Sequence, residues 1–201
     1  MSGIPILLEG AALRVLVVGG GPVAARKAAR FIHAGAEVHV VAPELCDDLE
    51  ELVRNGTVGV KRRRYEATDV DAVEVVIAAT DDRDVNAGVA RDARSAHRLV
   101  NVADAPDEGA FAFMAAHVTG PLTIGVSAGI PSAAARIRDA IASRFDARYD
   151  EPLRELVLAR RTLLDSGDAH VWRERAAAVI DADFCESVES GRLRTRTASW
   201  R

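Results

Sequence analysis

Near the start of the chain, an apolar run ends in glycines that have the spacing of a dinucleotide-binding turn. The pattern Gly19-x-Gly21-x-x-Ala24 follows the run 13–18 and leads into a segment rich in Ala, Arg and Lys. In this pattern one small residue makes the tight turn, the next lets the backbone approach a pyrophosphate, and the third lets the helix pack on the strand. The helix N-terminus then offers free N–H groups and a partial positive charge to phosphate. The alternative is a tight loop that binds nothing.

Two further loops carry polar groups that suit a nucleotide. Pro43 and Glu44 follow the second predicted strand, and Thr80 and Asp81 follow the fourth. An acid after the second strand usually accepts from the adenosine ribose of NAD, and no arginine stands in that loop to hold the 2′-phosphate of NADP. NAD is therefore the predicted cofactor. Glu44 comes slightly late for the ribose, and an acid that opposes the dipole of the next helix is an equal alternative.

Strands and helices alternate over the first hundred residues. Apolar and β-branched runs predict the strands, and segments rich in Ala, Arg and Asp predict the helices. This order is typical of a Rossmann-type doubly wound α/β fold with a parallel sheet, in which ligands bind beyond the carboxyl ends of the strands. We expect strands at 13–18, 37–41, 58–61, 73–79 and 99–102, and helices at about 22–34, 45–55 and 83–95.

The pattern changes beyond residue 105. Residues 110–117 and 122–126 predict two strands around Gly120-Pro121, and a helix is expected over about 132–145. A lone hairpin would leave its edges unpaired, so a homodimer is expected, with the Ile6–Leu8 segment as a further edge. The periodicity after residue 146 is helical. We predict three regions: 1–110, an NAD-binding Rossmann domain; 111–145, a small dimerisation region; and 146–201, a helical C-terminal domain.

Composition argues against several classes of protein. With 201 residues, 49% hydrophobic and 28% charged, the chain can form one full core and a small appendage. A net charge of −4 disfavours nucleic-acid binding, and no apolar run reaches the roughly 20 residues of a membrane span. Because the first ten residues do not resemble a signal peptide, a cytoplasmic location is expected. Cys46 and Cys185 are isolated and the five histidines lack metal-ligand spacing, so no metal site is predicted.

Taken in order, the motifs resemble those of one family. The chain is similar to the precorrin-2 dehydrogenase/sirohydrochlorin ferrochelatase family of sirohaem synthesis in PILLEG…RVLVVGGGPVAARKA, VHVVAPE, VVIAATDDRDVN, LVNVADAP and PLTIGVSAGIPSAAARIRD. The resemblance implies an enzyme that oxidises precorrin-2 to sirohydrochlorin with NAD⁺, and some members also insert Fe²⁺. The alternative from another class is a non-enzymatic Rossmann-type module that senses NAD. Likeness of fold alone would not produce these motifs in this order.

The resemblance also implies roles for individual residues. Asp104, in the NVADAP stretch, takes the position of the family's key acid, where it would accept a proton lost from the tetrapyrrole. An aspartate here is otherwise expected to cap the turn before Pro106. The cofactor residues implied are Gly19, Gly21, Pro22 and Val23 at the pyrophosphate, Pro43 and Glu44 near the adenosine ribose, and Thr80 and Asp81 near the nicotinamide half.

Substrate-binding residues are expected beyond residue 125. Guanidinium groups suit a tetrapyrrole rich in carboxylates, so Arg136 and Arg138 are candidates, with Ser127 in the loop before them. The family commonly reads S-x-G-G-x-S-P-x-x-A-R here, whereas this chain reads SAGIPSAAAR, which is one residue shorter. The alternatives are that the arginines form a solvated helix face and that a serine, Ser132 in particular, is the N-cap of the helix.

Overall fold

Five short runs rich in valine form one parallel sheet. The computed structural model describes residues 3–200, and the sheet belongs to a compact unit made of residues 6–113. The strands lie in the order β3-β2-β1-β4-β5, so the first strand is central and the chain winds outward from it in both directions. The strands are β1 (Arg14–Val18), β2 (Glu37–Val41), β3 (Gly59–Lys61), β4 (Val75–Ala78) and β5 (Leu99–Val102).

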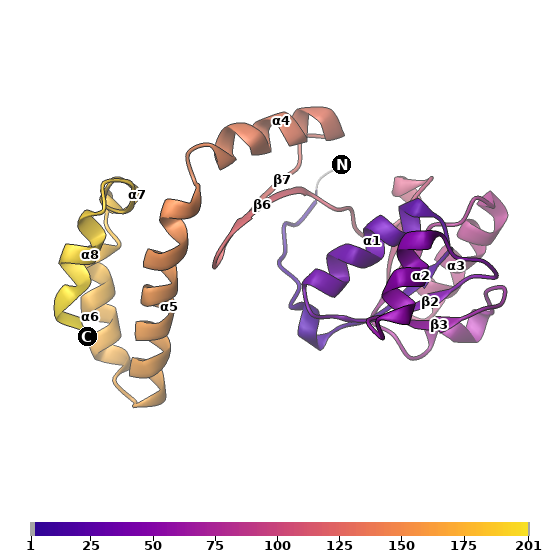
Figure 1. Cartoon of the computed structure of the whole chain (residues 1–201), viewed down its shortest axis with the longest axis horizontal. Helices are drawn as coiled ribbons and strands as arrows, with labels where there is room; N and C mark the ends of the chain where they lie inside the picture. The colour runs from indigo at the N-terminus through magenta and orange to yellow at the C-terminus, as the bar shows by residue number, and fades with distance from the viewer. Residues whose placement is uncertain (1–2, 201) are drawn as a thin grey trace. The chain divides into compact units, whose positions relative to one another are not determined.

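Helices cover both faces of this sheet (Figure 1). Alternate residues of β1 point to opposite faces, so Val15 and Val17 join one apolar cluster while Leu16 and Val18 join the other. The first cluster includes Ala24, Ala28 and Phe31 of α1, and the second includes Val89, Ala90 and Ala93 of α3. The predicted Rossmann-type doubly wound fold is therefore confirmed. The helices are α1 (Pro22–His33), α2 (Asp47–Arg54) and α3 (Arg83–Ser95), with 3₁₀ turns η1 (Gly10–Ala12), η2 (Ala67–Val70) and η3 (Pro106–Glu108).

The segment after β5 differs from its prediction. Residues 110–117 were expected to form a strand, but the strand β6 begins at Ala115 and ends at Thr119. Ahead of it, Phe111 and Phe113 pack edge to face with each other and against the α1 cluster. An apolar segment can cover a core in an irregular conformation and still have the composition of a strand. The sequence therefore did not distinguish an irregular segment from a strand here. Residues 6–8 likewise form neither helix nor strand.

Residues 3–5 and 114–200 form the second unit. β6 pairs antiparallel with β7 (Leu122–Val126) through a turn at Gly120, whose φ is 53°. A third apolar cluster gathers around Tyr149, whose hydroxyl donates to Glu189 at 2.9 Å, and Leu122 of the hairpin packs against it. The division of this part at residue 145 stays a prediction. The helices are α4 (Pro131–Ala142), η4 (Ala147–Tyr149), α5 (Asp150–Asp165), α6 (Ala169–Val179), α7 (Phe184–Glu189), α8 (Arg192–Thr197) and η5 (Ala198–Trp200).

A buried carboxylate holds the connection between β3 and β4. Asp69 accepts two hydrogen bonds from the Arg63 guanidinium, both at 2.7 Å, and one from Lys61 Nζ at 2.9 Å. The backbone N–H of Glu66 donates to the same carboxylate at 3.1 Å. The hydrogen bonds from Arg63, followed by the one from Lys61, hold the pKa of Asp69 well below its usual range, although burial acts to raise it.

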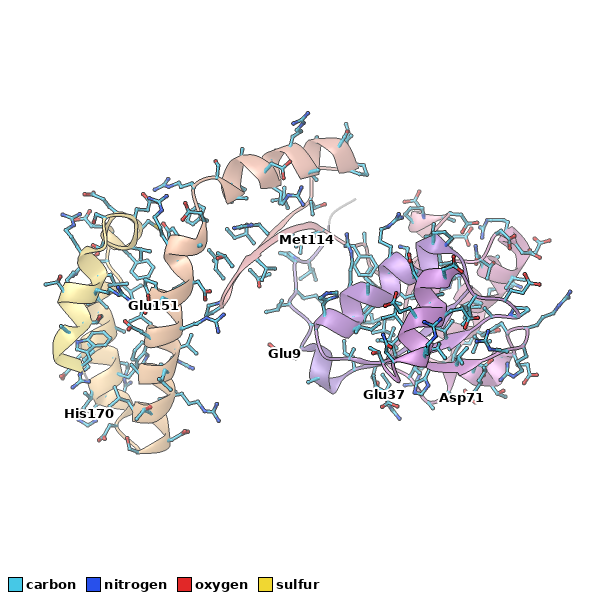
Figure 2. All side chains as sticks on the ribbon, in the orientation of Figure 1. Glu9, Glu37, Asp71, Met114, Glu151 and His170 are labelled. Carbon is cyan, nitrogen blue, oxygen red and sulfur yellow. The ribbon has the colours of Figure 1, made fainter. Side chains whose placement is uncertain are left out.

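We expect Asp69→Asn to lower the free energy of unfolding by about 2–3 kcal/mol at pH 7, because the amide has no charge to pair with the two cations. Its nitrogen also cannot accept the bonds that Oδ2 takes from Arg63 and from the Glu66 N–H. A lowered folded-state pKa stabilises the protein above the unfolded pKa, and this contribution is lost as the pH falls towards the folded value. The difference between the two proteins should therefore shrink below about pH 4. Urea denaturation at several pH values measures it. Asp71→Asn is the control, since Asp71 is exposed at the surface (Figure 2). An equal difference at pH 2 and pH 7 would contradict the assignment.

Candidate active site

The turn after β1 lies directly against the loops that follow the two neighbouring strands. Gly19 has a φ of 126°, and a Cβ there would overlap the main-chain oxygen of Ala79, just after β4. A Cβ at Gly20 would overlap the main-chain oxygen of Glu44, just after β2. Both positions therefore require glycine. Gly20 was not among the predicted site residues, because its constraint comes from a loop distant in sequence.

Gly21 stands in a different environment. It is the N-cap of α1 with a φ of −86°, and a Cβ there would meet no atom within 4 Å. No side chain caps this helix, and Pro22 at its first position has no N–H. The N–H groups of Val23 and Ala24 consequently have no partner inside the helix. Free N–H groups beside open space are what a pyrophosphate requires, so these residues fit an NAD cofactor.

The remaining cofactor candidates lie at the same edge of the sheet. β1 and β4 are neighbours, and the helices that follow them pack on opposite faces, so the chain reverses its winding direction between them. Ligands of open α/β sheets bind at this switch point. Thr80 and the exposed Asp81 follow β4, while Pro43 and Glu44 are exposed after β2.

The position of Glu44 bears on its alternative role. α2 begins at Asp47 with Cys46 as its N-cap, so Glu44 lies outside the helix. Asp47, Asp48 and Glu50 are the acids in the first turn, where the helix dipole acts most strongly. Glu44 is thus not the acid that opposes this dipole.

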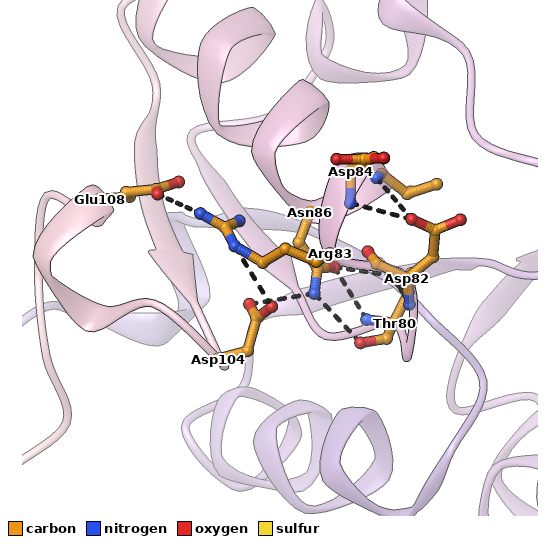
Figure 3. A network of polar contacts seen from close by, with 8 residues as sticks. Thr80, Asp82, Arg83, Asp84, Asn86, Asp104 and Glu108 are labelled. Carbon is orange, nitrogen blue, oxygen red and sulfur yellow. Dashed lines mark hydrogen bonds and ion pairs between the residues drawn. The ribbon is translucent and has the colours of Figure 1, made fainter.

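A polar network joins the loop after β4 to the segment after β5 (Figure 3). At its centre is Asn86 of α3, which is fully buried. The backbone N–H of Thr80 donates to Asn86 Oδ1 at 3.0 Å, and the Thr80 hydroxyl lies 2.8 Å from the same oxygen and 2.9 Å from the Asp82 carbonyl. Asn86 Nδ2 donates to the Thr80 carbonyl and to Asp104 Oδ1, both at 3.1 Å. Asp82 caps α3 by accepting from the N–H groups of Asp84 and Val85 at 2.9 and 3.2 Å.

Asp104 lies at the edge of this network, with its side chain 37% exposed. Its Oδ2 is 3.8 Å from Nε of Arg83, and Arg83 also forms an ion pair with Glu108. The alternative role as a turn cap is wrong, because the N-cap of η3 is Ala105 and no side chain caps that turn. The fold therefore brings Asp104 and Thr80, which are 24 positions apart, to a common partner.

Asn86 was missed by the sequence reasoning, although a signal was present. Asn86, Val89, Ala90 and Ala93 are the buried residues of α3 and follow the helical spacing of a core face. An amide on an otherwise apolar face must find hydrogen-bond partners when it is buried.

A second buried amide connects α1 to the chain after β5. Lys27 Nζ donates to Asn101 Oδ1 at 2.6 Å, and Asn101 Nδ2 donates to the carbonyl of Phe111 at 2.9 Å. Burial lowers the pKa of the Lys27 ammonium, and repulsion from Arg30 and Arg26 lowers it further. These hydrogen bonds hold the segment that follows Asp104 against α1, the helix that begins at the glycine turn.

The predicted substrate residues all belong to the second unit. Ser127 and Arg136 are exposed, and the Arg138 side chain pairs with its neighbour Asp139, with Nε to Oδ1 at 2.7 Å. The two arginines are two positions apart on α4, so their side chains diverge by about 200°. Ser132 is not the N-cap of α4. Ile130 is, because Pro131 takes the first helical position, which suits proline.

Two absences hold for residues 3–200. No group of three or more His, Cys, Asp or Glu side chains among them could hold a metal ion. None of their helices has the length and the apolar character needed to cross a membrane.

A family described as putative NAD(P)-binding matches residues 6–115, which include every strand of the parallel sheet and the whole polar network. The chain belongs to this family. Its Gly19–Val23 turn, with the uncapped start of α1, is the element of the fold that such a nucleotide requires.

Named relatives extend the likeness beyond this domain. The chain is 41% identical over 165 residues to a sirohaem synthase of Methylococcus capsulatus, covering 78% of this chain and 35% of that protein. It is 37% identical over 199 residues to the sirohaem synthase of Chromobacterium violaceum, covering 95% of this chain and 41% of that protein. The chain thus spans well under half the length of these relatives.

A solved structure matches the chain from end to end. The structure of SirC, a precorrin-2 dehydrogenase, superposes with a TM-score of 0.77 at 26% identity and covers 98% of both chains. Together with the sirohaem synthases, it confirms the resemblance drawn from the sequence motifs.

The glycines predict two distinguishable defects. Gly21→Asp places bulk and negative charge in the open space beside the α1 N-terminus, so NAD⁺ affinity should be lost while the thermal midpoint stays near that of the wild type. Gly20→Ala should instead lower the thermal midpoint, because its Cβ meets the Glu44 carbonyl. Calorimetric titration and thermal denaturation separate the two outcomes. Normal NAD⁺ binding by Gly21→Asp would refute the cofactor site.

Proposed function

We propose that this chain catalyses the NAD⁺-dependent oxidation of precorrin-2 to sirohydrochlorin. The observation that carries the proposal is the end-to-end structural match to SirC, a precorrin-2 dehydrogenase. The site agrees with it chemically, since an uncapped helix start and a partly exposed carboxylate border the same switch point. The similarity to sirohaem synthases supports the same substrate class.

The reaction removes a hydride and a proton from the tetrapyrrole. Bound NAD⁺ supplies the hydride acceptor. The N–H groups at the start of α1 would hold the pyrophosphate, and Thr80 and Asp81 would bind the nicotinamide half. Asp104 accepts the proton as the C–H bond is oxidised and returns it to solvent through its exposed side.

The charge around β2 favours NAD over NADP. A 2′-phosphate would need a free cation near the end of β2, where Pro43 and Glu44 stand. Of the four cations on the neighbouring strand and just after it, Lys61 to Arg64, the first three are already paired. Arg62 makes two hydrogen bonds of 2.7 Å to Glu50, and Lys61 and Arg63 form ion pairs with the buried Asp69.

Substrate recognition is assigned to the second unit. Ser127, Arg136 and Arg138 would bind the carboxylates of the tetrapyrrole, with Arg138 exchanging Asp139 for a substrate carboxylate. Fe²⁺ is the proposed second substrate, inserted into sirohydrochlorin with Asp104 accepting the pyrrole protons. The proposed location is the cytoplasm, which agrees with Cys46 and Cys185 both being free.

A homodimer is proposed from the hairpin of the second unit. Its two strands pair only with each other in the described part of the chain, and a two-stranded sheet is marginally stable alone. Val118 of β6 is 63% exposed and Ile130 before α4 is 61% exposed. A second copy of this surface would cover both edges and apolar side chains.

Asp104→Asn should fold and bind NAD⁺ but lose turnover of precorrin-2 by about 10²–10⁴-fold, because Asn keeps the shape and removes the basicity. Absorbance assays with NAD⁺ measure the oxidation, and a second arm with Fe²⁺ and preformed sirohydrochlorin measures insertion. Near-normal oxidation by the variant would show that Asp104 is not the base. If the wild type binds NAD⁺ but turns over nothing, the chain is the sensing module instead.

Light scattering should give a mass of about twice 21.4 kDa at micromolar concentration. Val118→Asp should lower this mass towards the monomer, because it places a charge on the proposed interface. Val157→Asp, on an exposed apolar residue of α5, is the matched control and should stay dimeric. A wild-type mass of 21.4 kDa would rule the dimer out.

A further inference from the structure

The orientation of the Asn86 side chain is determined by its partners. A backbone N–H can only donate, so the 3.0 Å bond from Thr80 N identifies the oxygen of the Asn86 amide. The Thr80 hydroxyl lies 2.8 Å from the same oxygen and 2.9 Å from the Asp82 carbonyl, and its single proton goes to one of these two acceptors. The amide nitrogen must therefore point the other way, towards the Thr80 carbonyl and Asp104.

The two N–H bonds of this amide serve different ends. One N–H donates to the carbonyl of Thr80, only six positions earlier in the chain, and so joins α3 to the loop after β4. The other reaches Asp104 Oδ1 across 18 positions of the chain. A buried N–H is costly unless it is hydrogen-bonded, and the acceptor that this one finds is the Asp104 carboxylate.

Two residues of α3 lie against the two oxygens of the Asp104 carboxylate. Asn86 donates to Oδ1 from a buried, fully bonded position, while Nε of Arg83 is 3.8 Å from Oδ2. These two residues are three positions apart and so share one side of the helix. Arg83 is half exposed and shared with Glu108, which makes Asn86 the fixed member of the pair (Figure 3).

We propose that Asn86 is a positioning residue that aims the Asp104 carboxylate into the active site and ties its direction to the nicotinamide loop at Thr80. The hydrogen bond itself is independent of the reaction, whereas its kinetic consequence rests on the proposed function. Two experiments address these parts separately.

The first experiment observes the amide directly by ¹⁵N–¹H correlation spectroscopy. The chain has no glutamine and three asparagines, Asn55, Asn86 and Asn101, so the spectrum contains three carboxamide pairs. Asp104→Ala should shift one proton of the Asn86 pair upfield and speed its exchange with water, because that proton loses its acceptor. The Asn101 pair, bonded to Phe111, should not move.

Glu108→Ala is the matched control for this spectrum, since Glu108 contacts Arg83 but not Asn86. An Asn86 pair that stays in place in Asp104→Ala overturns the proposal, whatever reaction the enzyme catalyses. Because the native Asn86 is observed, no folding defect at position 86 affects this result.

The second experiment measures turnover. Asn86→Asp keeps the acceptor for Thr80 but turns an oxygen towards Asp104, so kcat for precorrin-2 should fall about 10–100-fold while KM for NAD⁺ changes less than about twofold. Arg94→Ala is the control on the same helix, because Arg94 reaches only the Glu108 carbonyl, at 2.8 Å. Its kcat should remain at the wild-type value.

The outcomes separate this proposal from the proposed function. A rise in KM for NAD⁺ at normal kcat would mean that Asn86 serves only the cofactor loop and would overturn the positioning role. If Asn86→Asp does not fold, Asn86→Ser is measured in its place. A normal kcat of Asn86→Ser would likewise overturn the positioning role. A wild type with no turnover refutes the proposed function and leaves the spectroscopic result to decide whether Asn86 holds Asp104.

Discussion

The close approach of the turn after β1 to its neighbouring loops is the constraint on which the site depends. Gly19 and Gly20 allow this approach, because a side chain at either would overlap a main-chain oxygen of the adjacent loop. With the turn held from both sides, the next residue becomes the N-cap of α1 and faces open space. Packing of the backbone thus leaves free N–H groups beside open space, an arrangement that suits a phosphate without a charged side chain.

The order of the strands brings the predicted site residues to the same edge of the sheet as the glycine turn. Because β4 and β5 follow β1 in the sheet, the loops carrying Thr80 and Asp104 lie next to each other and next to the glycine turn. α3 supplies the connection, since the buried Asn86 bonds to both loops. On the other face, Lys27 and Asn101 tie α1 to the chain that leaves β5. Buried polar groups therefore hold each half of the site.

The second unit exposes apolar and basic side chains at its surface. Its apolar cluster is small and centred on Tyr149, while the hairpin and α4 leave apolar and basic side chains exposed. Association with another copy would bury the exposed apolar side chains, and an anionic ligand would pair with the basic ones. These are the two roles proposed for this unit. The end-to-end match to SirC includes this unit as well as the sheet.

The sequence alone was sufficient for the nucleotide-binding fold, because its signals are local. The strands at 37–41 and 99–102 and the helix at 83–95 have the predicted bounds, since periodicity and capping act over a few residues. The family motifs also indicated Asp104, whose role as the base stays a prediction. Tertiary structure decided what lies around these residues. Gly20, Asn86 and the packing of Phe111 depend on partners far along the chain, and Pro131 displaced Ser132 from the cap. A sequence pattern shows which residues are apolar or polar, but only the folded chain determines which of them meet.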